Sequence, residues 1–517
     1  MRYNSSKYVR GRIAGGLWRS RLSFGAVLTA LIGGAAGLSA EEAVMLKNRR
    51  ELFLDDFLVQ EVSGLDYRQG VPVAAGTALR FDKAWEGQAV AYASVVATGD
   101  KFQMYYRGGT GAKENGNLTC YAESSDGIHW ERPSLGLHEV DGSTANNVIL
   151  PPRDPTWATE NFSVLLDARP GVPADERYKA VGGGAGNLPQ LKFSGLTRGL
   201  YRFVSADGIR WRRLPGEPLF TGYSLDSQNV LTWLPEEQCY AVYLRTWTGD
   251  KSGEKFNYKS IRTIARSVST DFAKWSEPVR MTFDQGGVED LYTNATQPYF
   301  RAPQILIAMP FRFVRDRRVL DEATLKKYAI LPVMWNGVSD AVLMSSRGGT
   351  HYQRKFMESF VRPGVDPTSW AARSNMPALG VVQTGPAEMS FYIIRGYASN
   401  QVRIERMALR LDGFASLHAG YVAGSAITRP VILDGRRLVL NLSTSASGYA
   451  KVVVLDESGK EIPGFGEAEA NELVGDAIEL PAAWKNSPSL AQLKGRIVHL
   501  KFLLRDADLY SVAVLDQ

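Results

Sequence analysis

A short turn motif recurs along this chain and restricts the folds that it can adopt. "SSDGIHW" at 124–130 returns as "SADGIRW" at 205–211 and "STDFAKW" at 269–275, with weaker copies at 345–352 and 410–417. Asp-Gly favours a tight reversal, because Gly accepts a positive φ and Asp accepts hydrogen bonds from nearby backbone. The turns are 81, 64, 76 and 65 residues apart. This spacing predicts a supersecondary unit that is used five times.

The segments before each turn indicate what the unit is. Two β-rich, apolar segments precede a third that leads into the turn, as in "AYASVVATGDKFQMYYRG" and "NVLTWLPEEQCYAVYLRTW". Four antiparallel strands repeated in this way are typical of a β-propeller blade. We therefore expect an all-β chain with a five-bladed propeller at 41–423. The turn aspartates and the tryptophans that follow them, Trp130, Trp211 and Trp275, are interpreted as structural.

The pattern changes after residue 423. Segments such as "RRLVLNLSTSASGYAKVVVLDESG" and "GRIVHLKFLLRDADLYSVAVLD" alternate apolar and polar residues over short strands. This alternation predicts a small β-sandwich at 424–517.

Residues 1–40 differ from the rest of the chain. Six basic residues and no acidic ones precede an uncharged stretch at 22–38, and "LSA" at 38–40 offers small residues for cleavage. These features predict a secretory signal peptide, and hence a secreted or periplasmic protein. The alternative is an N-terminal membrane anchor. No later segment approaches about 20 consecutive apolar residues, so we expect no membrane contact after cleavage.

The overall charge does not indicate a nucleic-acid partner. The formal charge of +6 comes entirely from residues 1–40, and the remaining basic and acidic residues balance. The sequence pI of about 9.0 therefore says little about the mature chain, for which we expect no nucleic-acid binding.

We expect neither a metal nor a cofactor. The five histidines are scattered without metal-ligand spacing, and no nucleotide-binding motif lies in a suitable context. Cys120 and Cys239 allow either a disulfide or two buried thiols. The oligomeric state is not predicted.

Polar residues gather where the innermost strand of each blade is expected to begin. Carboxylates stand there in four segments, as Glu86, Asp226, Glu289 and Glu388, although Asp and Glu have low β-propensity. The accompanying candidates for substrate binding are Trp85, Asn161, Asp167, Gln228, Asn229, Tyr292, Asn294, Gln297 and Arg373. Carboxylates, amides and aromatic rings around one channel mouth are what sugar binding and glycosidic cleavage require.

Several strings also resemble a known group of proteins. "LFLDDFLV", "AWEG", "SSDGIHWERPSLGL", "LDSQNV", "LYTNATQPY" and "PALGVVQTG" are similar to bacterial glycosyl-hydrolase-like proteins, within the invertase and arabinanase type of propeller hydrolases. The resemblance implies three carboxylates on successive blades, which by blade position fall on Glu86 or Asp56, Asp167 and Asp226. The "NDPNG" signature and the Glu-Cys motif of invertases are missing.

The resulting hypothesis is a secreted glycoside hydrolase with a carbohydrate substrate. Glu289 and Glu86 are the first choices for acid and base and Asp226 for the third carboxylate, while Glu388 and Arg373 bind or orient substrate. Carboxylates that face each other across a channel favour the wider separation of an inverting mechanism. Two alternatives stay open, a non-catalytic carbohydrate-binding propeller and a glycoside phosphorylase.

Overall fold

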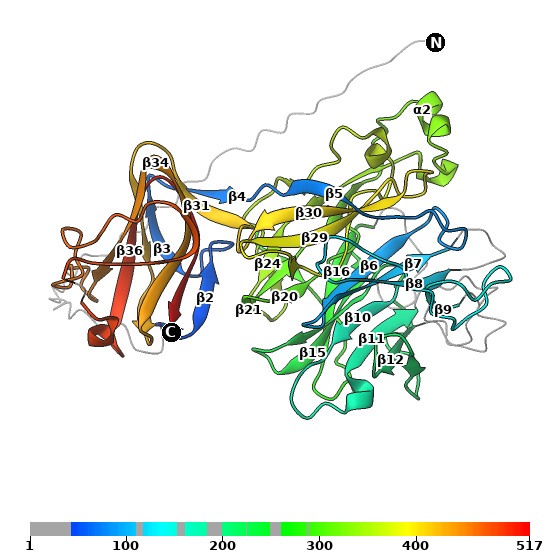
Figure 1. Ribbon diagram of the computed structural model, residues 1–517, viewed down its shortest axis with the longest axis horizontal. Coiled ribbons are helices and arrows are strands. Elements are labelled where there is room, and N and C mark those ends of the chain that lie inside the picture. The colour runs from blue at the N-terminus through cyan, green and yellow to red at the C-terminus, as the bar shows by residue number, and fades with distance from the viewer. Residues whose placement is uncertain are drawn as a thin grey trace, which may run out of the picture. The chain divides into compact units, whose positions relative to one another are not determined.

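The computed structural model describes residues 43–109, 117–151, 161–183, 199–223, 225–248, 260–286, 289–486 and 488–516. The expected signal peptide, 1–40, lies outside these ranges. β-Strands dominate the described residues, with one short α-helix, α2 (Glu322–Lys327), and four brief 3-10 segments, η2 (Ala174–Glu176), η3 (Pro332–Met334), η4 (Pro367–Trp370) and η5 (Leu490–Leu493) (Figure 1). The expected all-β fold class is confirmed. No helix in the described ranges is long and apolar enough to cross a membrane.

Three antiparallel four-stranded sheets follow one another along the chain. In each, the strands pair in sequence order, which is the order of a propeller blade. The first comprises β6 (Ala91–Ala97), β7 (Phe102–Gly108), β8 (Leu118–Ser124) and β9 (Val148–Leu150). The second comprises β10 (Ser163–Leu166), β11 (Tyr178–Gly183), β12 (Leu200–Ser205) and β13 (Arg212–Arg213). The third comprises β14 (Val230–Leu234), β15 (Cys239–Trp247), β16 (Arg262–Ser269) and β17 (Val279–Arg280).

The next stretch, 282–361, forms split sheets. One contains β19 (Asp290–Leu291), β22 (Phe311–Val314), β23 (Val338–Val342) and β26 (Ser359–Val361). A second contains β20 (Gln297–Tyr299), β21 (Ala302–Ala308) and β24 (Met344–Ser346), and β18 (Thr282–Phe283) pairs with β25 (His351–Tyr352).

The last sheet before the C-terminal region takes a strand from the N-terminal part of the chain. β27 (Met376–Pro377) and β28 (Val382–Gln383) pair with β29 (Glu388–Arg395), and β29 pairs with β30 (Arg403–Arg410). The outer neighbour of β30 is β5 (Val73–Arg80), which lies more than 300 residues earlier in the chain. Because 282–361 is split and this sheet is completed by β5, the count of five blades stays a prediction.

The first strands of these sheets contact one another in turn. β6 contacts β10, β10 contacts β14, and β14 contacts β20. The segment between β27 and β28 returns to β6. There the amide of Leu379 donates to the carbonyl of Ala93 (2.9 Å), and the amide of Val95 donates to the carbonyl of Leu379 (2.6 Å). This succession of inner strands is typical of a propeller.

The recurrent turns hold themselves together as the sequence suggests. Oδ1 of Asp126 accepts hydrogen bonds from the amides of Ile128 (2.7 Å) and His129 (2.8 Å). The indole of Trp130 donates to the carbonyl of Gly127 (3.3 Å). The same contacts recur at Asp207 with Trp211 and at Asp271 with Trp275.

The first two recurrent turns also pack against a neighbouring sheet. The Tyr392 hydroxyl on β29 donates to the carbonyl of Gly127 (2.6 Å), so the first turn contacts the last sheet. At Gly208 an added Cβ would lie 2.3 Å from Oη of Tyr105 on β7, so the second turn packs on the first sheet. The turns therefore join successive sheets as well as reversing the chain.

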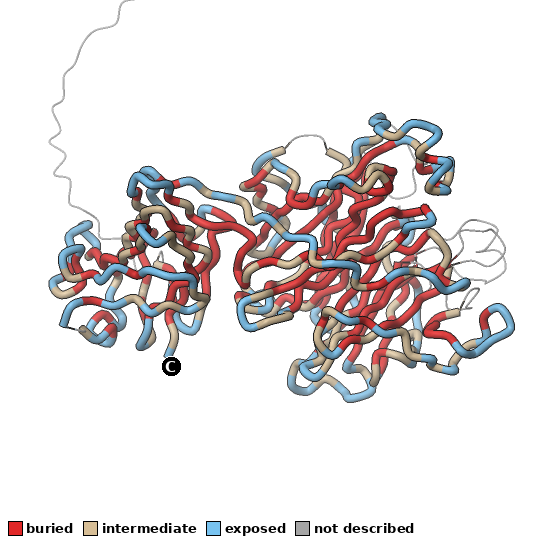
Figure 2. The backbone as a smooth tube through the Cα atoms, turned by 45° about the horizontal axis from the view of Figure 1, so that its top comes forward, coloured by how far each residue is buried: buried red, intermediate tan, exposed pale blue. Residues whose placement is uncertain are grey.

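The C-terminal sheet includes strands from the start of the described chain. β31 (Ala415–Ala419), β32 (Gly424–Thr428), β33 (Val431–Leu433), β34 (Arg437–Leu455), β35 (Asp476–Pro481) and β36 (Ile497–Leu515) share it with β1 (Val44–Leu46), β2 (Arg49–Leu52), β3 (Val59–Ser63) and β4 (Asp66–Gln69). The sequence analysis expected residues from 41 onward to belong to the propeller, but residues 44–69 pair here. Pairing between distant segments leaves no trace in local periodicity, which explains the difference. Figure 2 shows long buried stretches separated by exposed ones, and the strands β3, β4 and β5 are mostly not buried.

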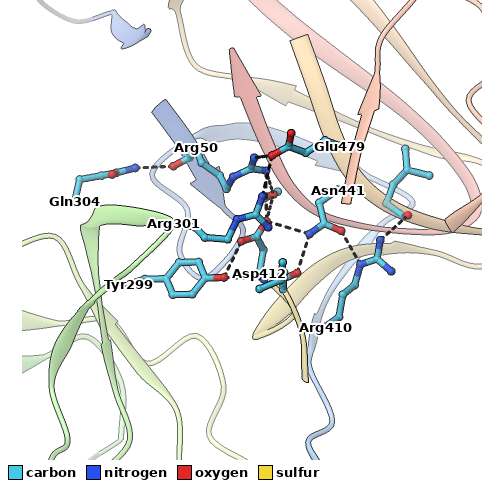
Figure 3. Close-up of polar contacts among 11 residues, drawn as sticks. Arg50, Tyr299, Arg301, Gln304, Arg410, Asp412, Asn441 and Glu479 are labelled. Atoms are coloured by element: carbon cyan, nitrogen blue, oxygen red, sulfur yellow. Dashed lines mark hydrogen bonds and ion pairs between the residues drawn. The ribbon is translucent and has the colours of Figure 1, made fainter. Parts of the chain in front are cut away.

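Asp412 connects the last turn to the C-terminal sheet (Figure 3). This carboxylate is fully buried and accepts hydrogen bonds from the Tyr299 hydroxyl (2.8 Å) and the Asn441 amide (3.0 Å). It also pairs with Arg50 (3.4 Å) and Arg301 (3.2 Å). At this copy of the turn, the aspartate therefore binds side chains from β20, β34 and β2.

Candidate functional site

A group of tyrosines and arginines lies where several inner strands begin. We call it the mouth cluster; its members are Tyr92, Arg107, Asp226, Arg245, Arg262, Tyr292, Arg373 and Tyr397. The Arg107 guanidinium lies 4.6 Å from the Tyr92 ring and donates to the Tyr397 hydroxyl (3.1 Å). The Arg262 guanidinium lies 4.6 Å from the ring of Tyr292. Arginines over aromatic faces are held by cation–π attraction, which fixes their positions around the cluster.

Arg373 differs from Arg107 and Arg262 in its hydrogen-bond and ion-pair contacts. It is half-buried, lies 5.6 Å from the Tyr292 ring, and forms no hydrogen bond or ion pair with any described residue. Burial alone would lower the pKa of Arg373, but nearby tyrosines and Asp226 together raise it. Asp226 is exposed, and its charge acts on both Arg373 and Tyr92. An arginine with no hydrogen-bond or ion-pair partner among the described residues, in the field of an exposed carboxylate, is suited to binding a polar ligand.

The backbone is strained at several inner-strand positions. Tyr92 (φ 55°), Asn161 (φ 62°), Ala295 (φ 45°) and Arg373 (φ 62°) occupy the left-handed region. The pairing of β6 with β7 also shifts register between Ala91 and Ser94, around Tyr92. Left-handed non-glycine residues are uncommon, and bulges and strain gather at functional sites. The strain therefore points to the same end of the inner strands as the arginines do.

Asn161 and Gln228 line the inner strands in different ways. Asn161 is fully buried, and neither polar atom of its amide has a partner among the described residues. A buried amide of this kind is normally satisfied by water or a ligand. The Gln228 amide instead donates to the carbonyls of Tyr92 and Ala93 (3.2 Å each) and to Oγ of Ser94 (3.0 Å). Gln228 thus joins the third sheet to β6.

Glu86 stands just before β6 but is fully buried and occupied. Its carboxylate accepts from the Tyr106 hydroxyl (2.6 Å), the Arg132 guanidinium (2.7 Å) and the amide of Lys83 (3.2 Å). These contacts engage both carboxylate oxygens and indicate a structural role. The neighbouring predicted residue Trp85 donates its indole N–H to Asn147 (2.9 Å).

Two predicted residues lie at the opposite end of the inner strands. Asp167 directly follows β10, where it pairs with Arg169 (2.7 Å) and accepts from the Tyr240 hydroxyl (2.5 Å). Glu388 begins β29, which is antiparallel to the inner strand β28, and it pairs with Arg406 (2.7 Å). The structure therefore does not bring these two carboxylates together with Asp226.

Glu289 precedes β19 and forms two ion pairs, with Arg354 (2.6 Å) and Arg312 (3.0 Å). Burial alone would raise its pKa, but the two arginines lower it below the ordinary value. Glu289 therefore remains ionised at neutral pH and is poorly suited to donate a proton. It lines a cavity that contains no member of the mouth cluster.

The remaining predicted residues serve local structure or lie near the cluster. The Asn229 amide donates to the carbonyls of Leu225 (3.0 Å) and Ser227 (2.9 Å), and that of Asn294 donates to Tyr243 (3.1 Å). Oε1 of Gln297 accepts from the amide of Val381 (3.3 Å). Asp56, named by the resemblance, is exposed and pairs with Lys355 (2.5 Å).

Sequence reasoning missed several members of the mouth cluster. Tyr92 is hidden in the apolar run "AVAYASVV", and Tyr397 follows β29 in "IIRGYAS". A detectable signal was present in the recurrent arginine near the end of the second strand, as in "YYRG", "YLRTW" and "IIRGY". Arg107 and Arg245 occupy this position.

The described residues contain no group of three or more His, Cys, Asp or Glu side chains that could hold a metal ion. Cys120 and Cys239 are both free and buried.

Comparison with known proteins gives only distant similarities. No family model matches the chain, and no curated protein matches it. Among solved structures, it is similar to an N-acetylgalactosamine deacetylase from F. plautii in complex with blood group B trisaccharide (12% identity, 67% of this chain and 96% of that chain, TM-score 0.44). It is also similar to a glycosyl hydrolase from Bacteroides ovatus (12%, 71% and 95%, 0.37). A third is an α-L-arabinofuranosidase from Podospora anserina in complex with cellotriose (10%, 66% and 96%, 0.37). TM-scores below 0.5 assign no role to any residue of this chain.

Proposed function

We propose that this chain is a glycoside hydrolase that binds its sugar at the mouth cluster. The observation that carries the proposal is Arg373, whose guanidinium forms no hydrogen bond or ion pair with a described residue. It is held on left-handed backbone and feels the charge of the exposed Asp226 carboxylate. Backbone strain of this kind is retained where the surrounding structure fixes a side chain for function.

The chemistry of the cluster suits a sugar. The three tyrosines are buried and hold the arginines by cation–π contact and hydrogen bonding, and the arginines offer several donors to hydroxyl or anionic groups. Burial raises the pKa of Tyr92 well above its ordinary value, so its hydroxyl stays protonated and can donate a hydrogen bond. These groups would orient the sugar ring against Asp226.

Asp226 is our first choice for a reacting carboxylate. It is exposed, whereas Glu86 is fully buried and bound by Arg132. Glycosidic cleavage commonly uses a proton donor and an ionised carboxylate. Glu289 is ionised but lines a separate cavity, so it does not act on a sugar held at the mouth cluster. An inverting mechanism and export through residues 1–40 remain parts of the proposal.

One observation favours a second candidate function, a non-catalytic carbohydrate-binding protein. Glu86 and Glu289 are each engaged by arginine, which leaves Asp226 as the unengaged carboxylate among the three predicted catalytic residues. Binding would need the aromatic rings and arginines but no proton transfer.

The test is sugar release by residues 41–517 across plant, algal and host glycans, with and without inorganic phosphate. Asp226→Asn should lower turnover by a factor of about 10² or more and preserve binding, because proton transfer contributes at least that much. The matched control is Asp175→Asn, which changes an exposed aspartate on η2. Equal turnover by both variants would refute the role of Asp226. Binding without release would favour the second candidate, and release only with phosphate would indicate a phosphorylase.

A further inference from the structure

A cavity of about 670 Å³ lies beside the sheet that contains β19, β22, β23 and β26. Glu289, Arg312 and Asp340 line its sheet side, while Arg362 and Trp370 come from the segment that connects this sheet to the next. Its volume falls in the range of small-ligand sites, which is about 300–1,000 Å³. None of its lining residues belongs to the mouth cluster.

The two carboxylates of the cavity are already neutralised by the protein. Arg312 binds Asp340 (2.6 Å) and Glu289 (3.0 Å), and Arg354 adds a second ion pair to Glu289 (2.6 Å). Asp340 lies opposite Arg312 in the register of β22 and β23, so the strand pairing itself fixes this contact. The carboxylates are therefore not available to attract a cation.

Two further arginines leave the cavity with excess positive charge. Arg317 and Arg362 line it, are exposed, and form no side-chain hydrogen bond or ion pair with a described residue. With Arg312 and Arg354 matched against Glu289 and Asp340, both of these charges remain uncompensated. Guanidinium groups bind carboxylates and sulfates through paired hydrogen bonds, so this charge favours an anionic ligand.

Trp370 adds a fixed aromatic surface. The residue is half-buried at the end of η4, and its indole donates to the carbonyl of Gly364 (2.8 Å). The side chain of Asp366 accepts from the amide of Thr368 (2.9 Å) and caps η4, which supports the position of the indole. A rim-exposed indole with its N–H already satisfied presents apolar ring surface to a ligand.

We propose that this cavity binds an acidic sugar residue. The carboxylate or sulfate of the sugar engages Arg317 and Arg362, and its ring packs against Trp370. The inference goes beyond the proposed function, because binding in this cavity requires no turnover at the mouth cluster. If the cavity binds such a residue, the glycan that the protein recognises carries carboxylate or sulfate groups.

Calorimetric titration of residues 41–517 tests the proposal with three probes: tetragalacturonate for the carboxylate, a chondroitin sulfate tetrasaccharide that adds sulfate, and galactotetraose as a neutral sugar. We expect at least one acidic probe to bind, and its affinity to fall as salt is raised. Arg317→Gln with Arg362→Gln should weaken that binding at least tenfold. The matched control is Arg496→Gln, an exposed arginine of the C-terminal region, which should leave it unchanged.

Trp370→Ala should weaken the same probe without changing the salt dependence, since it removes ring contact and no charge. The same titrations with Asp226→Asn measure binding in this cavity without turnover at the mouth cluster. If an acidic probe binds in the cavity but the wild type hydrolyses no glycan, only the proposed function is contradicted. Failure of both acidic probes to bind, equal binding of the neutral probe, or binding that survives the double arginine variant would overturn the inference.

Discussion

Replacing Gly208 by alanine should destabilise the protein far more than the same change at an open turn. Gly208 has a φ of +75°, and a left-handed alanine costs about 1–2 kcal/mol. The new Cβ would lie 2.3 Å from Oη of Tyr105 and 3.0 Å from the ring of Tyr178. Tyr105 is fully buried, so it cannot move aside into solvent. Overpacking of this kind adds about 1–3 kcal/mol, so we expect a total of about 2–5 kcal/mol.

Gly142→Ala is the matched control. Gly142 has a φ of +79°, but a Cβ there meets no atom within 4 Å, so this variant isolates the backbone penalty of about 1–2 kcal/mol. Urea denaturation followed by tryptophan fluorescence measures both variants, with Trp211 as a reporter next to the turn. Tyr105→Phe removes the nearest atom and should recover about 1 kcal/mol or more in the Gly208→Ala background, as a double-mutant cycle. Equal destabilisation by the two glycine variants would refute the view that this turn locks adjacent sheets.

Two further predictions concern buried and turn carboxylates. Asp412→Asn should lower the free energy of unfolding by about 3 kcal/mol, because Arg50 and Arg301 lose their buried counter-charge and keep only the partly exposed Glu479. Urea denaturation should show less than about 1 kcal/mol for Asp476→Asn, which breaks an exposed pair. Stability should also fall as pH drops below about 4, the ordinary carboxyl pKa. Burial alone would raise the pKa of Asp207, but amide donors from the residues that follow lower it, so the folded form favours the ionised carboxylate and this stabilisation disappears on protonation. Thermal midpoints between pH 7 and 2 check this, and Asp207→Asn should flatten the acid limb; an unchanged limb would contradict it.

The sequence was most informative where a feature is local and repeated. The hydrogen bonds of the Asp-Gly turns are local, because the partners of Asp126 and Trp130 lie within three residues along the chain. The all-β class followed from the same repeat. What the turns pack against was not predictable, because Tyr392 lies 265 residues from Gly127.

The candidate site was harder to predict, because the role of a carboxylate depends on distant partners. Glu86 and Asp226 look alike in sequence, each just before an expected inner strand. In the structure Glu86 is buried and bound by Arg132, whereas Asp226 is exposed and its charge acts on Arg373. Neither arginine is a sequence neighbour of the carboxylate that it affects. The sequence predicts that Glu388 begins an inner strand. In the structure the short strands β27 and β28 come first and pair antiparallel with β29, so Glu388 lies at the opposite end of the sheet from the starts of the inner strands.

The pairing of β5 with β30 has a consequence for how the chain acquires its structure during synthesis. Residues 73–80 emerge from the ribosome early, but their partner at 403–410 is made more than 300 residues later. At synthesis rates of about 5–20 residues per second, β5 waits on the order of half a minute before it can join its sheet. β2 waits longer still for its partner strand, β36. The nascent chain therefore carries unpaired edge strands until translation is almost complete, and truncation near the C-terminus would leave the N-terminal strands without partners.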